Sequence, residues 1–482
     1  MAALASAARS RRRLLPYLSR LLHSASTTAV SPWPSTSRFL RHASPVPRTP
    51  DHSPYLRFPA ARVSTLPSGL RIVTQAYPAA TRMASVGVWV DAGSRFELPG
   101  TNGTAHFLEH MAFKGTRRRP NAQALEARHV PAALDVLSDI LQHPRFPEKA
   151  IQRERGVILR EMEEVQGMME EVIFDHLHAA AFQGHPLGDT ILGPEENIRS
   201  ISKKDLEQYI STHYTCPRMV VSAAGSVSHD EVVDQVKELF AEFSTDPTTA
   251  DQLVEANPAI FTGSEVRVEN AELPLAHVAI AFKGASWTDP SSIPLMVIQS
   301  ILGSWYRSIG VGNCSGSSLA RGISNANLAE SLMAFNTNYR DTGIFGIYTI
   351  APPDTLHDLS RLIMAEFRRL ASQVSETEVA RARNQLKSAL LLHMDGSTAV
   401  SENNGRQMLT YGRVMPFLEL FARIDAVDCA TIMETAKEYI IDKDVALAGV
   451  GQLTNLPELS WFRSETCSDD DFTRRIFFGN AK

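Results

Sequence analysis

Alternating apolar and polar residues predict strands in both halves of the chain. Within residues 85–91, Val86, Val88 and Val90 lie two positions apart. Their side chains therefore point to one face of a strand, which we expect to be buried. Residues 63–75 predict a hairpin. The other predicted strands lie at residues 219–224, 277–283, 327–350 (a strand pair) and 445–450.

Helices are predicted between these strands. The predicted helices lie at residues 103–115, 131–142, 147–166, 205–213, 293–304, 356–370 and 379–389. The first of them follows Asn102, a residue type that is favoured as a helix N-cap. It closes on Gly115, a residue type that is common just past a helix C-terminus.

The second half of the chain repeats the order of elements in the first half. Residues 379–389 match the pattern of residues 151–161, with arginines at the same two positions. Such an internal duplication predicts two domains of similar plan. The predicted segments are a leader at 1–55, a first domain at 60–245, a linker at 246–265, a second domain at 266–463 and a tail at 464–482.

The leader differs from the rest of the chain in composition. Eight arginines and many Ser and Ala residues, but no acidic residue, precede Asp51. This composition is typical of a mitochondrial transit peptide, and a disordered nucleic-acid-binding tail is the alternative. The whole chain has a formal net charge of −5, so the part after the basic leader is distinctly acidic. An acidic protein favours basic partners and argues against a nucleic-acid ligand.

The segment His106-Phe107-Leu108-Glu109-His110 carries the candidate chemistry. Two histidines four positions apart lie on one face of a helix, with Glu109 beside them. Such a pair can bind one Zn²⁺, and the nearby carboxylate can accept a proton from an attacking water. The order His-x-x-Glu-His is the motif of the inverted zincins. The alternative is a solvated amphipathic helix.

The duplication points to acidic residues that only the first half carries. Ala382 and Ala389 stand in the second half where the first has Glu154 and Glu161. These glutamates are two helical turns apart, so both can face the site of the histidines. Three protein ligands and an open fourth position are typical of a catalytic zinc site. The alternative is a solvated, salt-bridged helix face.

A resemblance to a known family rests on three segments, Gly103–Thr116, Arg153–Met162 and Leu332–Tyr339. They are similar to the pitrilysin family, and within it to the β-type subunits of processing peptidases. The resemblance implies an α+β fold of two tandem homologous domains, each a mostly antiparallel sheet covered by helices. It also implies a zinc endopeptidase that works with an α subunit on arginine-rich presequences. Its place would be the mitochondrial matrix or the matrix face of the inner membrane.

The resemblance also assigns roles to the residues of the motif. The zinc ligands of the family match His106, His110 and Glu161. The general base of the family matches Glu109, and a second acidic residue that supports the site matches Glu154. The family therefore selects Glu161 as the third ligand of one zinc ion.

Substrate-binding roles follow from the same resemblance. Glu171 and Asp175 match acidic positions that contact the arginine just upstream of the cut. Phe113 matches the aromatic wall of the pocket for the residue after the cut. Only a short version of the Gly-rich loop of α subunits is found, at residues 310–316. Its shortness favours the β type.

One segment is shorter than the family pattern. Glu161 follows His110 by 51 positions, fewer than in the family. The second half carries a strand pair at 327–350, whereas the first half passes from Glu126 almost directly to its next helix. We infer that a strand pair is missing beside Ala127-Arg128-His129. In relatives an extended substrate adds as a further strand there, so the loss would remove half of the peptide clamp.

The missing strands leave two alternatives to an active peptidase subunit. The chain can be a catalytically impaired variant of such a subunit. It can also be a structural core subunit of the cytochrome bc1 complex, a role that close relatives of the family fill. All four residues of the zinc and base set, His106, Glu109, His110 and Glu161, are nevertheless present.

Overall fold

The structure is a computed structural model that describes residues 58–77, 83–119, 129–309 and 316–467. Some predictions concern residues outside these ranges. They are the leader at 1–55, the proposed gap at 126–128, the glycines at 310 and 312, and the end of the tail at 468–482.

The first half forms a four-stranded sheet in the order β1-β2-β4-β3. Its strands are β1 (Arg62–Thr65), β2 (Arg71–Ala76), β3 (Ala84–Val90) and β4 (Met219–Gly225). β1 and β2 form the predicted antiparallel hairpin. β4 runs parallel to β2 and antiparallel to β3, so the last strand of this half is inserted between earlier ones.

The second half forms a six-stranded sheet in the order β5-β10-β6-β9-β8-β7. Its strands are β5 (Glu265–Glu269), β6 (Ala276–Gly284), β7 (Ser304–Tyr306), β8 (Ser331–Asn338), β9 (Gly343–Ala351) and β10 (Ala446–Gly451). β10 runs parallel to β5 and antiparallel to β6, as β4 does with β2 and β3. The α+β class with mostly antiparallel sheets is therefore confirmed.

Helices surround both sheets. Those of the first half are α2 (Thr104–Ala112), α3 (Val130–Gln142), α4 (Glu148–Gln166), α5 (Met169–Ala181), α6 (Glu195–Ser200), α7 (Lys203–His213) and α8 (His229–Leu239). Those that follow are α9 (Ala250–Ala256), α10 (Ser292–Leu302), α11 (Ser318–Ala326), α12 (Leu356–Ser372), α13 (Glu376–His393), α14 (Ser397–Thr410), α15 (Phe417–Asp425), α16 (Cys429–Tyr439) and α17 (Leu459–Glu465). α9 lies inside the stretch that we placed as a linker.

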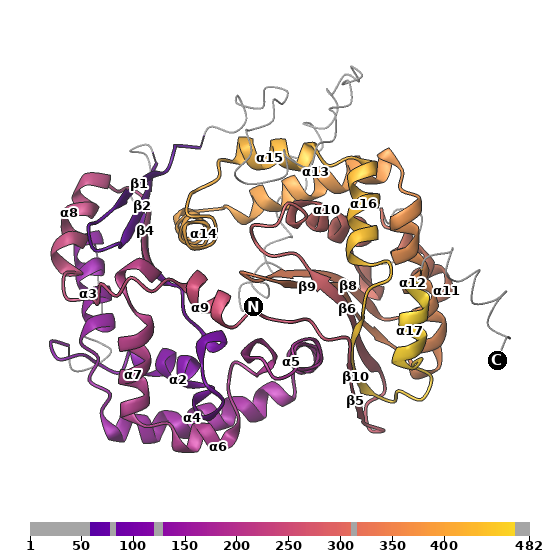
Figure 1. Ribbon diagram of the computed structural model, residues 1–482, viewed down its shortest axis with the longest axis horizontal. Coiled ribbons are helices and arrows are strands. Elements are labelled where there is room, and N and C mark those ends of the chain that lie inside the picture. Colours follow the sequence, from indigo (N-terminus) through magenta and orange to yellow (C-terminus); the bar gives the residue numbers. More distant parts are fainter. Residues whose placement is uncertain (1–57, 78–82, 120–128, 310–315, 468–482) are drawn as a thin grey trace. The chain divides into compact units, whose positions relative to one another are not determined.

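Each half contributes one helix that packs against the sheet of the other half (Figure 1). α5 buries Ile173, Phe174 and Leu177 in a cluster with Ala279 and Ala448 of the second sheet. α14 packs across β2, β3 and β4 of the first sheet. Because the exchange is reciprocal, neither sheet completes its packing without the other half.

This exchange explains why the predicted single buried face of β3 is wrong. All seven residues of β3 are half-buried. Val86, Val88 and Val90 pack into the apolar cluster on one side. On the other side the ring of Trp89 lies against α14, where a Cβ on Gly405 would come within 2.3 Å of it. A helix that comes from the other half therefore covers the face expected to be exposed.

The two sheets differ beside the strand that precedes the histidine helix. β6 pairs with β9 along its whole length, and β9 pairs with β8. Within the described ranges no strand pairs with the corresponding edge of β3. Only residues 113–129 connect α2 to α3, whereas residues 303–355 connect α10 to α12. The shorter connection accounts for the difference between the sheets.

The start of this short connection is fastened to α3. Thr116 Oγ1 donates a hydrogen bond of 2.6 Å to Asp139 Oδ2. The Arg119 guanidinium pairs with both Asp135 and Asp139. Thr116 also forms an antiparallel bridge with Pro144. These contacts hold residues 116–119 directly against α3 and the turn that follows it.

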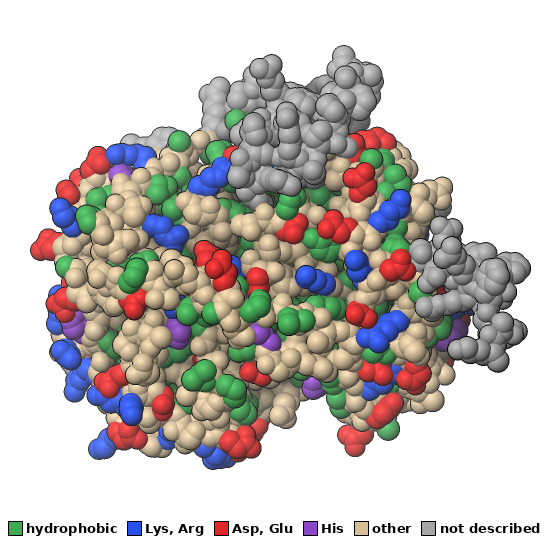
Figure 2. All heavy atoms as spheres, viewed as in Figure 1, with side chains coloured by type: hydrophobic (Ala, Val, Ile, Leu, Met, Phe, Trp, Pro, Cys, Tyr) green, Lys and Arg blue, Asp and Glu red, His purple; other side chains and the backbone are tan. Residues whose placement is uncertain are grey.

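Charged side chains of both signs are interspersed over the face shown in Figure 2. That face therefore carries no broad patch of a single sign. Among the described residues, no helix combines the length and the apolar character that a bilayer span requires.

Candidate metal centre

Glu97 holds the start of α2, the helix that carries both histidines. Its Oε1 accepts a hydrogen bond of 2.5 Å from the amide of Ala105. Its Oε2 accepts bonds from the amide of Gly103 (2.9 Å) and from Asn102 Nδ2 (3.0 Å). The first amides of a helix have no partner inside it and carry partial positive charge, so a carboxylate suits this position.

The prediction that Asn102 caps α2 is therefore wrong. Its side chain donates to Glu97 and to the carbonyl of Thr190 instead of accepting a bond from the helix. Gly103 is the N-cap residue, with a left-handed φ of 99°. A Cβ there would come within 2.6 Å of the carbonyl oxygen of Leu192. The turn into α2 thus requires glycine.

Apolar packing between α2 and α4 brings the charged residues together. Phe107 and Met111 of α2 are buried in one cluster with Ile151 and Ile158 of α4. Residues three or four positions from Ile158 share its helical face, and these positions include Glu154 and Glu161. The buried face of α4 therefore presents both glutamates toward α2.

His106, His110 and Glu161 converge on one point. Glu161 Oε2 lies 3.1 Å from His110 Nε2 and 3.7 Å from His106 Nε2. One ligand atom from each of the three lies within 4.8 Å of the others. Ligand atoms about 3.4 Å apart surround a tetrahedral Zn²⁺ with bonds of about 2.1 Å. The donor set and its spacing therefore fit a zinc ion.

Glu154 lies beside this cluster and outside its set of ligand atoms. Its carboxylate is buried, with Oε2 3.5 Å from His110 Nδ1 and Oε1 2.9 Å from Lys114 Nζ. A carboxylate on the second nitrogen of a metal-binding histidine fixes the orientation and tautomer of the ring. The supporting role of Glu154 stays a prediction.

His106 has a less complete environment than His110. Burial lowers the pKa of His106 below its ordinary value, while the carboxylate of Glu161 opposes this shift. The imidazole is therefore neutral at pH 7, as a metal ligand must be. Its buried Nδ1 has no hydrogen-bond partner among the described residues. Metal-binding histidines usually donate their second ring N–H to a carboxylate or a carbonyl, and the described residues provide no such partner for His106.

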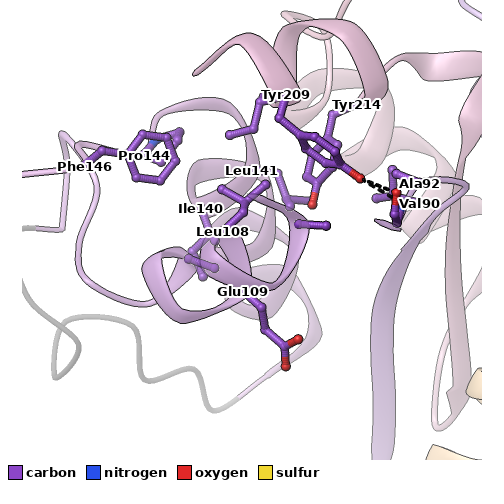
Figure 3. Close-up of a pocket in the computed structure, with 14 residues that line it drawn as sticks. Val90, Ala92, Leu108, Glu109, Ile140, Leu141, Pro144, Phe146, Tyr209 and Tyr214 are labelled. Carbon is purple, nitrogen blue, oxygen red and sulfur yellow. Dashed lines mark hydrogen bonds between the residues drawn. The ribbon is translucent and has the colours of Figure 1, made fainter. Parts of the chain in front are cut away.

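Glu109 lies at the edge of a cavity of about 340 Å³. The lining is mostly apolar and includes Leu108, Leu141, Phe146 and Tyr214. Figure 3 shows the Glu109 carboxylate pointing away from Tyr209 and Tyr214. Glu109 is exposed, and no hydrogen bond or ion pair joins it to a histidine within the described ranges. Its carboxylate is consequently free to contact a substrate or a water.

The three residues expected to bind substrate are not joined to the cluster by any contact within the described ranges. Glu171 and Asp175 lie on α5, one turn apart. Burial, followed by the nearby Glu171, raises the pKa of Asp175 to about 6. Phe113 follows the last residue of α2, and its side chain is 56% exposed. All three remain predictions for substrate binding.

Sequence reasoning missed two residues of the metal centre. Lys114 neutralises the buried Glu154; its position four residues after His110 was a usable clue, because i,i+4 neighbours lie close together. Glu97 had no comparable clue, because it reaches α2 across a loop whose path the sequence does not reveal.

Two histidines on one helix and a glutamate from a second helix form a cluster that can hold a metal ion, in the arrangement typical of inverted zincins. Residues 71–129 and 121–195 match the family model described as insulinase (peptidase family M16). Residues 200–386 match the model described as the inactive domain of peptidase M16. The chain belongs to the M16 family of peptidases.

Two relatives illustrate the similarity within the family. A probable β subunit of the mitochondrial-processing peptidase from Arabidopsis thaliana is 54% identical over 455 residues, covering 89% of this chain and 85% of the relative. The β subunit of the human mitochondrial-processing peptidase is 45% identical over 438 residues, covering 86% of this chain and 88% of the relative.

Two solved structures share the fold. A chain of complex III2 from Candida albicans has a TM-score of 0.73 at 24% identity and covers 84% of this chain and 100% of that chain. A protease from Helicobacter pylori has a TM-score of 0.70 at 17% identity, with coverages of 82% and 100%. At such identities the likeness concerns the fold alone.

The matches are interrupted where the strand pair is inferred to be missing. The two matches to the M16 model overlap at residues 121–129, which indicates that a stretch of the model between them has no counterpart. The Arabidopsis alignment of 455 positions is also longer than 89% of this 482-residue chain. That relative therefore has residues in the matched span that this chain lacks.

Proposed function

We propose that this chain is the zinc-carrying β-type subunit of a mitochondrial peptidase that removes presequences together with an α subunit. The observation that carries the proposal is the convergence of His106, His110 and Glu161 within 4.8 Å in an M16 peptidase. The relatives are named β subunits of a mitochondrial-processing peptidase, which supports the organelle, the processing activity and a need for another subunit. Presequences as the substrate and an α subunit as the partner come from the resemblance of the sequence to the family.

His106, His110 and Glu161 would hold the Zn²⁺, which when bound supplies Lewis-acid chemistry for hydrolysis of a peptide bond. Glu109, exposed beside the two histidines, would accept a proton from the attacking water. It would then return that proton to the leaving amine. Glu154 keeps His110 in place throughout, because its carboxylate is buried against both His110 and Lys114.

Zinc binding is the first test of the proposal. We expect the purified full-length chain to hold one zinc ion, and the His106→Ala variant to lose it, because two remaining ligands bind zinc poorly. Elemental analysis after gel filtration measures this. His393→Ala is the matched control, since His393 is exposed at the end of α13. Full zinc in His106→Ala would refute the assignment.

Recognition of arginine by Asp175 predicts a pH dependence. Because the pKa of Asp175 is raised to about 6, its carboxylate is charged at pH 7.5 and mostly neutral at pH 5. We therefore expect the affinity for an arginine-bearing presequence peptide to fall as the pH drops through about 6. Fluorescence titration of wild type and Asp175→Asn measures it. If Asp175→Asn kept the wild-type pH profile, Asp175 would be excluded as the residue that recognises the arginine.

A second candidate function is a structural core subunit of the cytochrome bc1 complex. The observation that favours it is the edge of β3, which no strand covers within the described ranges, unlike that of β6. A subunit without a peptidase role would tolerate this loss. Presequence cleavage by the chain mixed with an α-type subunit distinguishes the two candidates.

A further inference from the structure

The loop at residues 93–97, which leads to α2, is held by contacts at several positions. Tyr209 Oη of α7 accepts a hydrogen bond of 2.8 Å from the amide of Gly93. The Arg218 guanidinium lies over the ring of Phe96, 4.8 Å from its centroid. Arg95 forms two bonds with Asp341, of 2.7 and 2.8 Å. The loop is therefore held in place before it reaches Glu97.

We propose that Glu97 is a positioning residue for the metal site, fixing the first turn of α2 so that His106 meets Glu161. The inference rests on the proposed zinc site and adds a residue to it. Glu97 is 5% exposed, and its carboxylate contacts the amides on both sides of Thr104. His106 follows the second of these amides directly.

The two histidines depend on Glu97 to different degrees. His106 is the third residue of α2, in the turn where no intrahelical bond holds the amides. His110 lies one turn later and is supported by Glu154. His106 also lacks a partner for Nδ1 within the described ranges. Glu97 is therefore the main polar support of the turn that carries His106.

The Arg95–Asp341 pair extends this support to the second half of the chain. Both side chains are largely buried, at 12% and 20% exposure. Asp341 lies in the turn between β8 and β9, and its Oδ2 also accepts a bond of 2.8 Å from the amide of Ala259. Arg95 is two residues before Glu97. The turn between β8 and β9 therefore helps to hold the start of α2.

The Glu97→Gln variant tests the proposal. The glutamine amide would face one of the helix amides with a donor, so at least one cap bond is lost. We expect zinc to bind about tenfold more weakly, as for other residues that orient metal ligands. Competition with a chromophoric chelator measures the dissociation constant. Hydrogen exchange of the metal-free protein should also accelerate at residues 103–107 and not across α4.

Glu366→Gln is the matched control, because Glu366 is a buried carboxylate, 6% exposed, on α12 of the second half. It should bind zinc as wild type does. Wild-type zinc affinity in Glu97→Gln, or equal weakening in Glu366→Gln, would overturn the proposal. If the wild-type chain itself held no zinc, the proposed function would fail instead, so the two failures are distinguishable.

Asp341→Asn serves as a second variant should Glu97→Gln fold poorly. It leaves the cap itself intact and removes the charge that holds Arg95. We expect a smaller weakening of zinc binding in the same direction, with faster exchange at residues 103–107. Unchanged zinc affinity and unchanged exchange in Asp341→Asn would overturn the part of the proposal that concerns the second half.

Discussion

The Glu109→Gln variant is expected to retain its zinc and to lose about 10²–10⁴-fold of its rate of presequence cleavage. Glutamine cannot accept and return a proton, so the attacking water would stay unactivated. The zinc should remain because Glu109 is exposed and lies outside the set of ligand atoms. Cleavage of a fluorogenic presequence peptide in the presence of an α-type subunit measures the rate.

Glu163→Gln provides a comparison for this variant. Glu163 is exposed on α4, two residues after Glu161, the proposed zinc ligand, so the two variants share the same change of charge near the site. We expect full activity in Glu163→Gln. A Glu109→Gln protein that cleaved at the wild-type rate would assign the proton transfer to another group, even if its zinc content were normal.

Local patterns predicted most of the strands of the described residues, but they left many helices, α5 and α14 among them, without a prediction. The hairpin predicted at residues 63–75 is β1 and β2, and the strands predicted at 219–224, 277–283 and 445–450 are β4, β6 and β10. The sequence pattern gave no sign that α5 and α14 pack on the sheet of the other half. Periodicity shows that a face is apolar, but it does not show which element covers that face. The half-buried second face of β3 is the consequence.

The metal centre was predictable to the extent that its residues share a helical face. His106 and His110 are neighbours on α2 by spacing alone, and Glu154 and Glu161 are neighbours on α4. What joins the two helices is the packing of Phe107 against residues such as Ile158, which spacing cannot specify. Glu97 was out of reach for the same reason, since its contact depends on the path of a loop.

The strand pair that we infer to be missing would bear directly on catalysis. In the second sheet three strands, β9, β8 and β7, lie beyond β6, and the first two of them correspond to the strand pair that we infer to be missing from the first sheet. Neighbouring strands are about 4.8 Å apart, so removing two of them moves a sheet edge by about 10 Å. A peptide that adds to the edge of β3 would therefore lie about 10 Å from the place that a complete sheet would offer. The proposed metal ligands can be correctly placed while the substrate is misplaced.

Restoring the strand pair should consequently raise activity more than any point substitution can. We expect a chimera that carries the Arabidopsis relative's segment between Arg119 and His129 to cleave presequence peptides at least about 10²-fold faster, since misplacement of about 1 Å can already cost that much. An insert of equal length made of Gly and Ser is the control, because it restores the spacing from His110 to Glu161 without a strand. Activity no higher in the chimera than in the Gly-Ser control, with zinc bound in both, would show that the strands are not what limits this chain.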